Sequence, residues 1–357
     1  MVMVARLRCQ EEEPQRNELT RVVVSLPHKC AKYNLTGDQD LISNRAIIRG
    51  TMDKERSTML TRRQAIATLA TLATGTLLKP SSVFASESGD NKTRFAVLGD
   101  FGTGETDEFA IAKQMLDTHH RSPFDLVLAV GDNIYPNGSA RYFVPNFEKP
   151  FEGLLQERVK FYAVLGNHDV EAGRKDQMNY PLFNMGGSNY YTIGRGNGLV
   201  DFFMLDSTAF DANQASWLEN SLRASRAVWK IAAMHHPIYS SGKKHGSETR
   251  LRAVLEPLFT RYHLQVAFAG HDHVYERTKP QKGIQHFITG AGGKMRRGDI
   301  DMKSPLRAAS YDTDNSFMVI ELDETEMTFK SISETGEVVD SGVIRQAVSA
   351  GEGTGSY

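Results

Sequence analysis

Five short polar clusters contain the side chains of this sequence that are best suited to binding metal ions. Each lies at the end of an apolar run, and together they supply carboxylate, amide, phenol and imidazole groups. The clusters are Gly99-Asp100-Phe101-Gly102, Gly131-Asp132-Asn133-Ile134-Tyr135, Gly166-Asn167-His168-Asp169, Met234-His235-His236-Pro237 and Gly270-His271-Asp272-His273. Oxygen and nitrogen donors without sulfur suit a pair of hard or borderline metal ions. One such cluster alone is more often a turn or a helix cap, but five in succession predict a metal centre.

The composition of the chain excludes some types of metal site and some classes of binding partner. It has 357 residues, 40% of them hydrophobic and 24% charged, and a formal net charge of -1. This balance offers no basic surface for nucleic acid or for an anionic membrane, so we expect no nucleic acid as a partner. The two cysteines are Cys9 and Cys30. A thiolate metal site and a disulfide framework are therefore excluded after residue 30.

The apolar runs are typical of buried β-strands, and helical stretches separate several of them. We expect strands at residues 94–99, 126–130, 159–165, 200–205, 229–234 and 264–269, and helices at 107–119, 147–157, 214–226 and 248–262. Runs at 317–322, 327–332 and 338–344, separated by turn residues, predict a meander. The pattern indicates an α/β fold in which helices cover sheets.

The position of the clusters at strand ends predicts that they meet in space. In open α/β sheets, the loops at the carboxyl ends of the strands form the ligand-binding crevice. Glycines precede Asp100, Asp132, Asn167 and His271, and glycine permits a sharp turn of the backbone and a close approach to an ion. His271 and His273 alternate along an extended segment, so both can point to the same side.

Residues 59–85 have the features of a twin-arginine-like export signal. Arg62 and Arg63 form a basic start, and residues 65–78 are uncharged and mildly apolar. This run is shorter than the roughly 20 residues that span a bilayer. We expect an exported protein, periplasmic or extracellular, which contacts the export machinery transiently and has no stable membrane insertion. A short buried or amphipathic helix is the alternative. Residues 1–58 are interpreted as an upstream extension, because Met52 and Met59 are alternative starts.

In their order, the five clusters resemble the motif set of the calcineurin-like metallophosphoesterase superfamily. Within it, the chain is similar to the small, single-domain purple acid phosphatases, because Gly102 stands two residues after Asp100 and Tyr135 three residues after Asp132. The resemblance runs from about residue 93 to residue 294. It implies that residues 86–357 form a single metallophosphoesterase catalytic domain, a four-layer α/β/β/α sandwich of two mixed β-sheets flanked by helices.

The resemblance also implies a ligand set for two metal ions, with Asp132 as the bridge between them. The first ion, expected to be Fe(III), would be bound by Asp100, Tyr135 and His273. The second ion, a divalent Fe, Zn or Mn, would be bound by Asn167, His235 and His271. The family places this ligand two residues before a proline, which selects His235 rather than His236 before Pro237.

The same resemblance gives other roles to three more histidines, two of them within the clusters and one outside them. His168 would be the general acid that protonates the leaving alkoxide, which is worth about 10²–10⁴ in rate. His245 would be a second catalytic histidine on the substrate side. His236 would line the pocket.

The expected reaction is the hydrolysis of small-molecule phosphate monoesters by metal-bound hydroxide at a dinuclear Fe(III)-M(II) centre, the reaction of an acid phosphatase. Two cations about 3.5–4 Å apart can clamp the phosphate oxygens. A phenol has a pKa of about 10, so its binding as phenolate requires a strong Lewis acid. The same site also fits a phosphodiesterase, a nucleotidase or a pyrophosphatase.

Two alternatives to a phosphoesterase are a dinucleotide-binding oxidoreductase and a non-catalytic protein on the same scaffold. A dinucleotide-binding oxidoreductase would use Gly99, Gly102 and Gly104, but their spacing departs from the fingerprint and four clusters would stay unexplained. A non-catalytic protein on the same scaffold would be marked by a missing ligand, and every expected ligand is present in the sequence.

Overall fold

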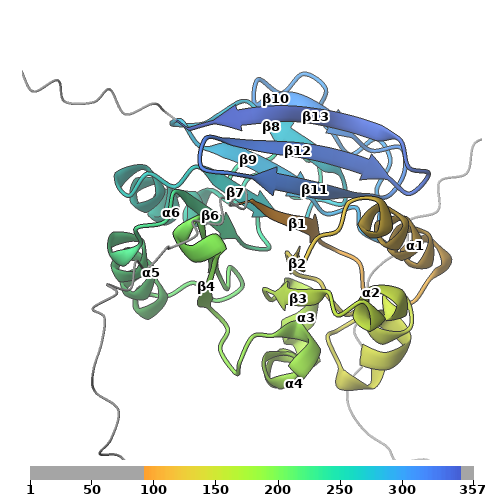
Figure 1. The fold of residues 1–357 in the computed structure, drawn as a ribbon. Coiled ribbons are helices and arrows are strands. Elements are labelled where there is room, and N and C mark those ends of the chain that lie inside the picture. The colour runs from red at the N-terminus through yellow and green to blue at the C-terminus, as the bar shows by residue number, and fades with distance from the viewer. Residues whose placement is uncertain (1–91, 347–357) are drawn as a thin grey trace, which may run out of the picture. The chain divides into compact units, whose positions relative to one another are not determined.

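Two mixed β-sheets pack face to face at the centre of the fold (Figure 1). The structure, a computed structural model, describes residues 92–346. The strand orders are β13-β12-β11-β1-β2-β3 and β10-β8-β9-β7-β6-β5-β4. The first sheet contains β1 (Thr93–Leu98), β2 (Leu126–Ala129), β3 (Lys160–Ala163), β11 (Ser316–Leu322), β12 (Glu326–Ser333) and β13 (Val338–Arg345). The second contains β4 (Tyr191–Arg195), β5 (Val200–Met204), β6 (Trp229–Ala233), β7 (Val266–Ala269), β8 (Tyr275–Thr278), β9 (Gln285–Thr289) and β10 (Arg307–Tyr311).

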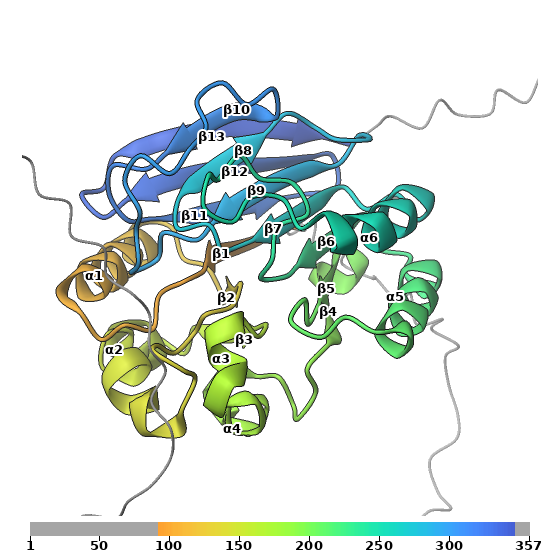
Figure 2. The same cartoon turned by 180° about the vertical axis from the view of Figure 1, so that it is seen from behind.

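Helices flank both sheets, as Figures 1 and 2 show from opposite sides. The α-helices are α1 (Thr106–Arg121), α2 (Glu152–Gln156), α3 (Asn167–Ala172), α4 (Arg174–Asn179), α5 (Ala212–Ala224) and α6 (Thr249–Arg261). Single helical turns of other types occur at Ala140–Tyr142, Val144–Glu148, Pro181–Phe183 and Gly196–Gly198. Helices α1 and α2 pack on the first sheet, and α5 and α6 pack on the second.

The alternation of side chains along the strands creates the layers. On β1, Phe95 points toward the second sheet and packs edge-on against Phe202 and Phe268. Leu98, three residues farther along β1 and therefore on the opposite face, belongs to the cluster under α1, together with Ile111. Successive residues of a strand face opposite sides, so one apolar run serves both the inter-sheet core and the helix layer. The predicted four-layer α/β/β/α sandwich is confirmed.

Several predicted elements differ from the structure. The helix expected at 147–157 is wrong, because Val144–Glu148 forms a π-helical turn and only α2 is α-helical. Pro150 lies inside the expected range and cannot donate a backbone hydrogen bond, which interrupts an α-helix there. Strands β4, β8, β9 and β10 were not predicted. Strand β9 begins with Gln285 and His286, so it lacks the apolar run that marks the other buried strands. The meander of β11, β12 and β13 is confirmed.

The proposed N-terminal segments lie outside the described residues. The upstream extension 1–58, the export signal 59–85 and the export that they imply therefore stay predictions. Residues 92–346 all belong to one compact unit. Within these described residues, no helix has both the length and the apolar composition needed to cross a membrane.

Candidate metal centre

Strand ends from both sheets bring the five polar clusters together. The backbone N–H of Asp100, after β1, donates to the carbonyl of Gly131, after β2, at 3.0 Å. The N–H of Gly270, after β7, donates to the carbonyl of His235, after β6, at 3.0 Å. The N–H of His271 donates to Asp100 Oδ2 at 2.9 Å, which joins the two sheets at the site. The predicted convergence of the clusters is therefore present in the structure.

Tyr135 lies at the centre of the first group of predicted ligands. Its hydroxyl oxygen is 2.9 Å from Asp132 Oδ2 and 3.4 Å from Asp100 Oδ1. The same oxygen is 3.5 Å from His273 Nε2, which is itself 3.4 Å from Asp100 Oδ1. All four side chains are buried. Their donor atoms thus surround one point.

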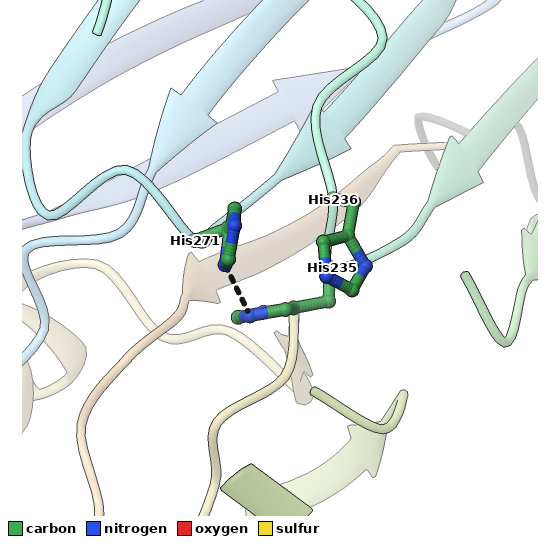
Figure 3. A group of neighbouring side chains, drawn as sticks. All are labelled: His235, His236 and His271. Atoms are coloured by element: carbon green, nitrogen blue, oxygen red, sulfur yellow. Dashed lines mark hydrogen bonds between the residues drawn. The ribbon is translucent and has the colours of Figure 1, made fainter. Parts of the chain in front are cut away.

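His235 lies at the centre of the second group. Its Nε2 is 3.1 Å from Asn167 Oδ1 and 3.5 Å from Asp132 Oδ1. The same nitrogen is 3.2 Å from His271 Nδ1, the pair that Figure 3 draws with a dashed line. These four side chains come from the ends of β2, β3, β6 and β7. They form a second convergent set of oxygen and nitrogen donors.

Asp132 faces each group with one of its two carboxylate oxygens. Oδ2 is the atom next to Tyr135, and Oδ1 is the atom next to His235. Oδ1 also accepts a hydrogen bond from the backbone N–H of His168 at 2.9 Å, which orients the carboxylate. A carboxylate placed in this way can contact two ions at the separation of about 3.5–4 Å that dinuclear sites use.

In the part of the chain that the structure describes, no lysine or arginine pairs with the two buried carboxyl groups of the site. Asp100 and Asp132 are 0% and 1% exposed, and within residues 92–346 their ion pairs are with histidines alone. Burial, and then the charge of Asp132, raise the pKa of Asp100, and burial raises the pKa of Asp132. Two buried carboxylates without a cation are costly. This set of donor groups therefore fits a site that binds metal cations.

The histidines of the site are in the state that binds metal. Burial lowers the pKa of His235 and of His271, and it lowers the pKa of His273 to about 4. Their imidazoles are therefore neutral at physiological pH. His235 Nδ1 donates to the carbonyl of Val130 at 3.0 Å, so its Nε2 keeps a lone pair directed at Asn167. A metal-binding imidazole is commonly oriented by such a bond from its other nitrogen.

The backbone at the strand ends is strained. Asp100, Asp132 and His271 have φ angles of 55°, 49° and 72°. A side chain in this left-handed region costs about 1–2 kcal/mol, and such strain concentrates at functional sites. Gly166 is required by space, because a Cβ there would lie 2.2 Å from Asp132 N. These turns aim the side chains of the clusters at one another.

The chain matches one family of known proteins. The sequence profile described as calcineurin-like phosphoesterase matches residues 93–275, just over half of the chain. Purple acid phosphatase 17 of Arabidopsis thaliana is 30% identical over 244 residues, which cover 59% of this chain and 72% of that protein. This chain belongs to the purple acid phosphatases of the calcineurin-like phosphoesterase family. A metal-dependent phosphoesterase with a dinuclear centre is what membership implies.

A second sequence relative and two solved structures are also similar to this purple acid phosphatase. Tartrate-resistant acid phosphatase type 5 of Homo sapiens is 26% identical over 291 residues, which cover 68% of this chain and 88% of that protein. The solved purple acid phosphatase PPD1 of yellow lupin has a TM-score of 0.63 at 20% identity, over 72% of this chain and 54% of that chain. GAP50, described as the anchor in the inner membrane complex of Plasmodium, has a TM-score of 0.63 at 22% identity, over 72% and 89% of the two chains. These two structures show a shared fold.

His168 stands beside the phosphatase site with one ring nitrogen free. Its ring lies 4.7 Å from that of Tyr135, measured between centroids. Its Nδ1 is 2.7 Å from the carbonyl of Pro136, so this nitrogen carries the hydrogen of the bond. The side chain is 36% exposed, and in residues 92–346 its Nε2 has no hydrogen-bond partner. This nitrogen is accessible to a substrate.

His245 lies next to the second group of predicted ligands, on the loop that precedes α6. Its ring centroid is 4.1 Å from that of His271. The buried carboxylate of Asp272 holds this loop, because it accepts hydrogen bonds from Ser240 Oγ at 2.5 Å and from the N–H of Gly246 at 3.2 Å. Asp272 therefore contacts the loop that carries His245.

The sequence did not reveal Ser207, which orients two histidines of the site. Its Oγ accepts hydrogen bonds from the backbone N–H groups of His235 at 3.2 Å and His236 at 3.0 Å. The Ser207 hydroxyl also lies at the hydrogen-bond distance of 2.9 Å from His236 Nδ1. His236 stands beside His235 and His271 in Figure 3 and could join them in binding a metal. A serine after a strand is not a typical sign of a metal site, so the role of Ser207 can be recognised only from its position in the fold.

Asp169 fastens the loops after β2 and β3 to each other. Its buried carboxylate accepts from the N–H groups of Asn133, Ile134 and Gly166 at 2.8–3.1 Å. It also accepts from Gln177 Nε2 at 2.7 Å. Asp169 therefore holds together the segments that carry Asp132 and Asn167.

Proposed function

We propose that this protein is an acid phosphatase that hydrolyses phosphate monoesters at a dinuclear centre of Fe(III) and a divalent Fe, Zn or Mn ion. Family membership supports phosphoester hydrolysis. The single observation that carries the dinuclear site is Asp132, which presents one carboxylate oxygen to each of two groups of ligand-type side chains. In this proposal Asp100, Tyr135 and His273 hold the ferric ion. Asn167, His235 and His271 hold the divalent ion.

The environment of Tyr135 supports ferric iron in the first group. Burial, and then the charges of Asp100 and Asp132, raise the pKa of its phenol. A phenol in such surroundings would lose its proton to solvent only if a strong Lewis acid bound its oxygen, and a trivalent ion is a stronger Lewis acid than a divalent ion. When bound, the two ions would neutralise the phosphate oxygens and lower the pKa of water at the site.

Side chains of the protein would position the substrate and supply the proton for the leaving group. The ligand side chains define where the phosphate lies, since they converge from both sheets on one place. His168 would hold a proton on Nε2 and pass it to the oxygen of the leaving alcohol, while the carbonyl of Pro136 keeps the ring oriented through Nδ1. His245 would contact the substrate from the loop before α6.

The experiment that tests this function is turnover of matched esters by the purified, metal-loaded protein. We expect p-nitrophenyl phosphate to be hydrolysed with a kcat/KM at least about 100-fold above that for bis(p-nitrophenyl) phosphate, a difference of about 2.7 kcal/mol in transition-state stabilisation. Equal rates, or faster hydrolysis of the diester, would overturn the proposal in favour of a phosphodiesterase. Elemental analysis of the same sample is expected to find two metal ions per chain.

Tyr135→Phe tests the ferric assignment by colour. Protein loaded with ferric and divalent ions is expected to absorb visible light, because a phenolate bound to Fe(III) has a charge-transfer band. Removal of the Tyr135 hydroxyl should abolish the band. Tyr142→Phe, a change at a tyrosine outside the ligand groups, should leave it unchanged. A band that survives Tyr135→Phe would show that this phenol is no ligand.

A further inference from the structure

Two loops beside the metal centre are joined into a single structural unit. Residues 240–246, before α6, and residues 294–301, after β9, run antiparallel and form a bridge at Gly242 and Ile300. The N–H of Lys243 donates to the carbonyl of Asp299 at 2.7 Å, and that of Asp301 donates to the carbonyl of Ser241 at 2.8 Å. We call these two segments together the basic ribbon.

The basic ribbon carries an excess of positive charge. Its basic residues are Lys243, Lys244, His245, Lys294, Arg296 and Arg297. Arg296 pairs with Asp299 of the ribbon at 3.5 Å, and Arg297 pairs with Asp314 at 3.2 Å. Within residues 92–346, Lys244 and Lys294 form no ion pair with an acidic side chain, and both are exposed. Two cations are therefore left available at the surface.

The basic ribbon reaches the metal centre at both of its segments. The ammonium group of Lys294 lies 4.4 Å from the centroid of the Tyr135 ring. The N–H of Arg296 donates to the carbonyl of His273 at 2.9 Å. On the other segment, His245 lies against His271, with ring centroids 4.1 Å apart. An anion that extends from the metal centre toward this side would meet Lys244 and Lys294.

We propose that the basic ribbon binds a second phosphate group of the substrate, next to the phosphate that is cleaved. The inference rests on the proposed phosphatase function and makes its substrate class more specific. A monoester with a single phosphate gives the two lysines no anion to contact. A second phosphate can accept charge-assisted hydrogen bonds from both, and their field also attracts a polyanion to the site. The preferred substrates are thus phosphate esters with two or more phosphates.

Binding of phosphonate probes tests the second site without turnover. Methylenediphosphonate carries two phosphate-like groups and methylphosphonate carries one, and isothermal titration calorimetry on the metal-loaded protein gives a Kd for each. The double variant Lys244→Met/Lys294→Met removes two charges and keeps the length of both side chains. We expect it to weaken diphosphonate binding about five- to tenfold more than phosphonate binding, the loss that two partly exposed ion pairs bring.

Lys330→Met, on the exposed face of β12, is the matched control and should change neither Kd. The proposal would be overturned if the double variant weakened the binding of both probes equally, or of neither, because the lysines would then act on the whole centre or not at all.

Kinetics with ADP and with a sugar bisphosphate show where the second phosphate is attached. In ADP it is linked directly to the phosphate that is cleaved, and in a sugar bisphosphate it is on another carbon. A selective loss of kcat/KM for either substrate supports the ribbon site, and a loss for neither contradicts it. Failure of the proposed function is a separate result, since p-nitrophenyl phosphate would then not be hydrolysed by the unmodified protein.

Discussion

Asp132→Asn is expected to reduce kcat at least about 10³-fold, which corresponds to about 4 kcal/mol of transition-state stabilisation. Asp132 is the residue that presents one oxygen to the Tyr135 group and the other to the His235 group. An amide has one acceptor oxygen and one NH₂ group, and it carries no charge. It therefore cannot contact both ions with anionic oxygens. Turnover of p-nitrophenyl phosphate and metal content per chain, measured on the same sample, are expected to fall together.

Asp125→Asn is the control for this change. Asp125 is exposed directly before β2, and Asp132 is buried directly after the same strand. The control variant should keep two metal ions and wild-type turnover. If Asp132→Asn also kept two ions and full activity, the bridging role of this carboxylate would be wrong, and with it the two-ion site.

His168→Ala is expected to reduce kcat about 10²–10⁴-fold, the usual contribution of a general acid, with metal content retained. Among the described residues, the imidazole makes one hydrogen bond, to the carbonyl of Pro136, and a weak contact of 3.8 Å to Glu171. Neither polar partner is a predicted ligand, and the ring touches the ligand Tyr135 only by packing beside it, so both groups of ligands should stay in place without the ring. The backbone N–H that orients Asp132 is also kept.

The leaving group shows whether His168 acts as an acid. An alkyl phosphate releases a strongly basic alkoxide that needs a proton, whereas p-nitrophenolate leaves more readily without one. The loss from His168→Ala should therefore be larger for an alkyl phosphate than for p-nitrophenyl phosphate. Equal losses would indicate a role in binding or positioning. His120→Ala, at an exposed histidine of α1, should have wild-type kinetics on both esters.

Much of the fold could be predicted from local patterns along the chain. Runs such as 126–130 are apolar on both faces because the strand lies between a helix layer and a second sheet, and this composition is visible in the sequence. The helix at 147–157 was wrong because one proline outweighed an otherwise helical stretch. Strand β9 was missed because Gln285 and His286 are buried through tertiary hydrogen bonds and packing, for which local composition gives no signal.

The sequence by itself determined the chemical inventory of the site: five strand ends with oxygen and nitrogen donors and no sulfur. Residue type and the position of a turn are local properties, so each cluster could be recognised where it stands. The tertiary structure alone decided which donor groups lie close enough together to bind the same ion. The bond from His271 to Asp100 spans 171 positions and joins two sheets, and the order of strands in those sheets is set by packing. Packing likewise placed Ser207 behind two histidines and Lys294 over Tyr135.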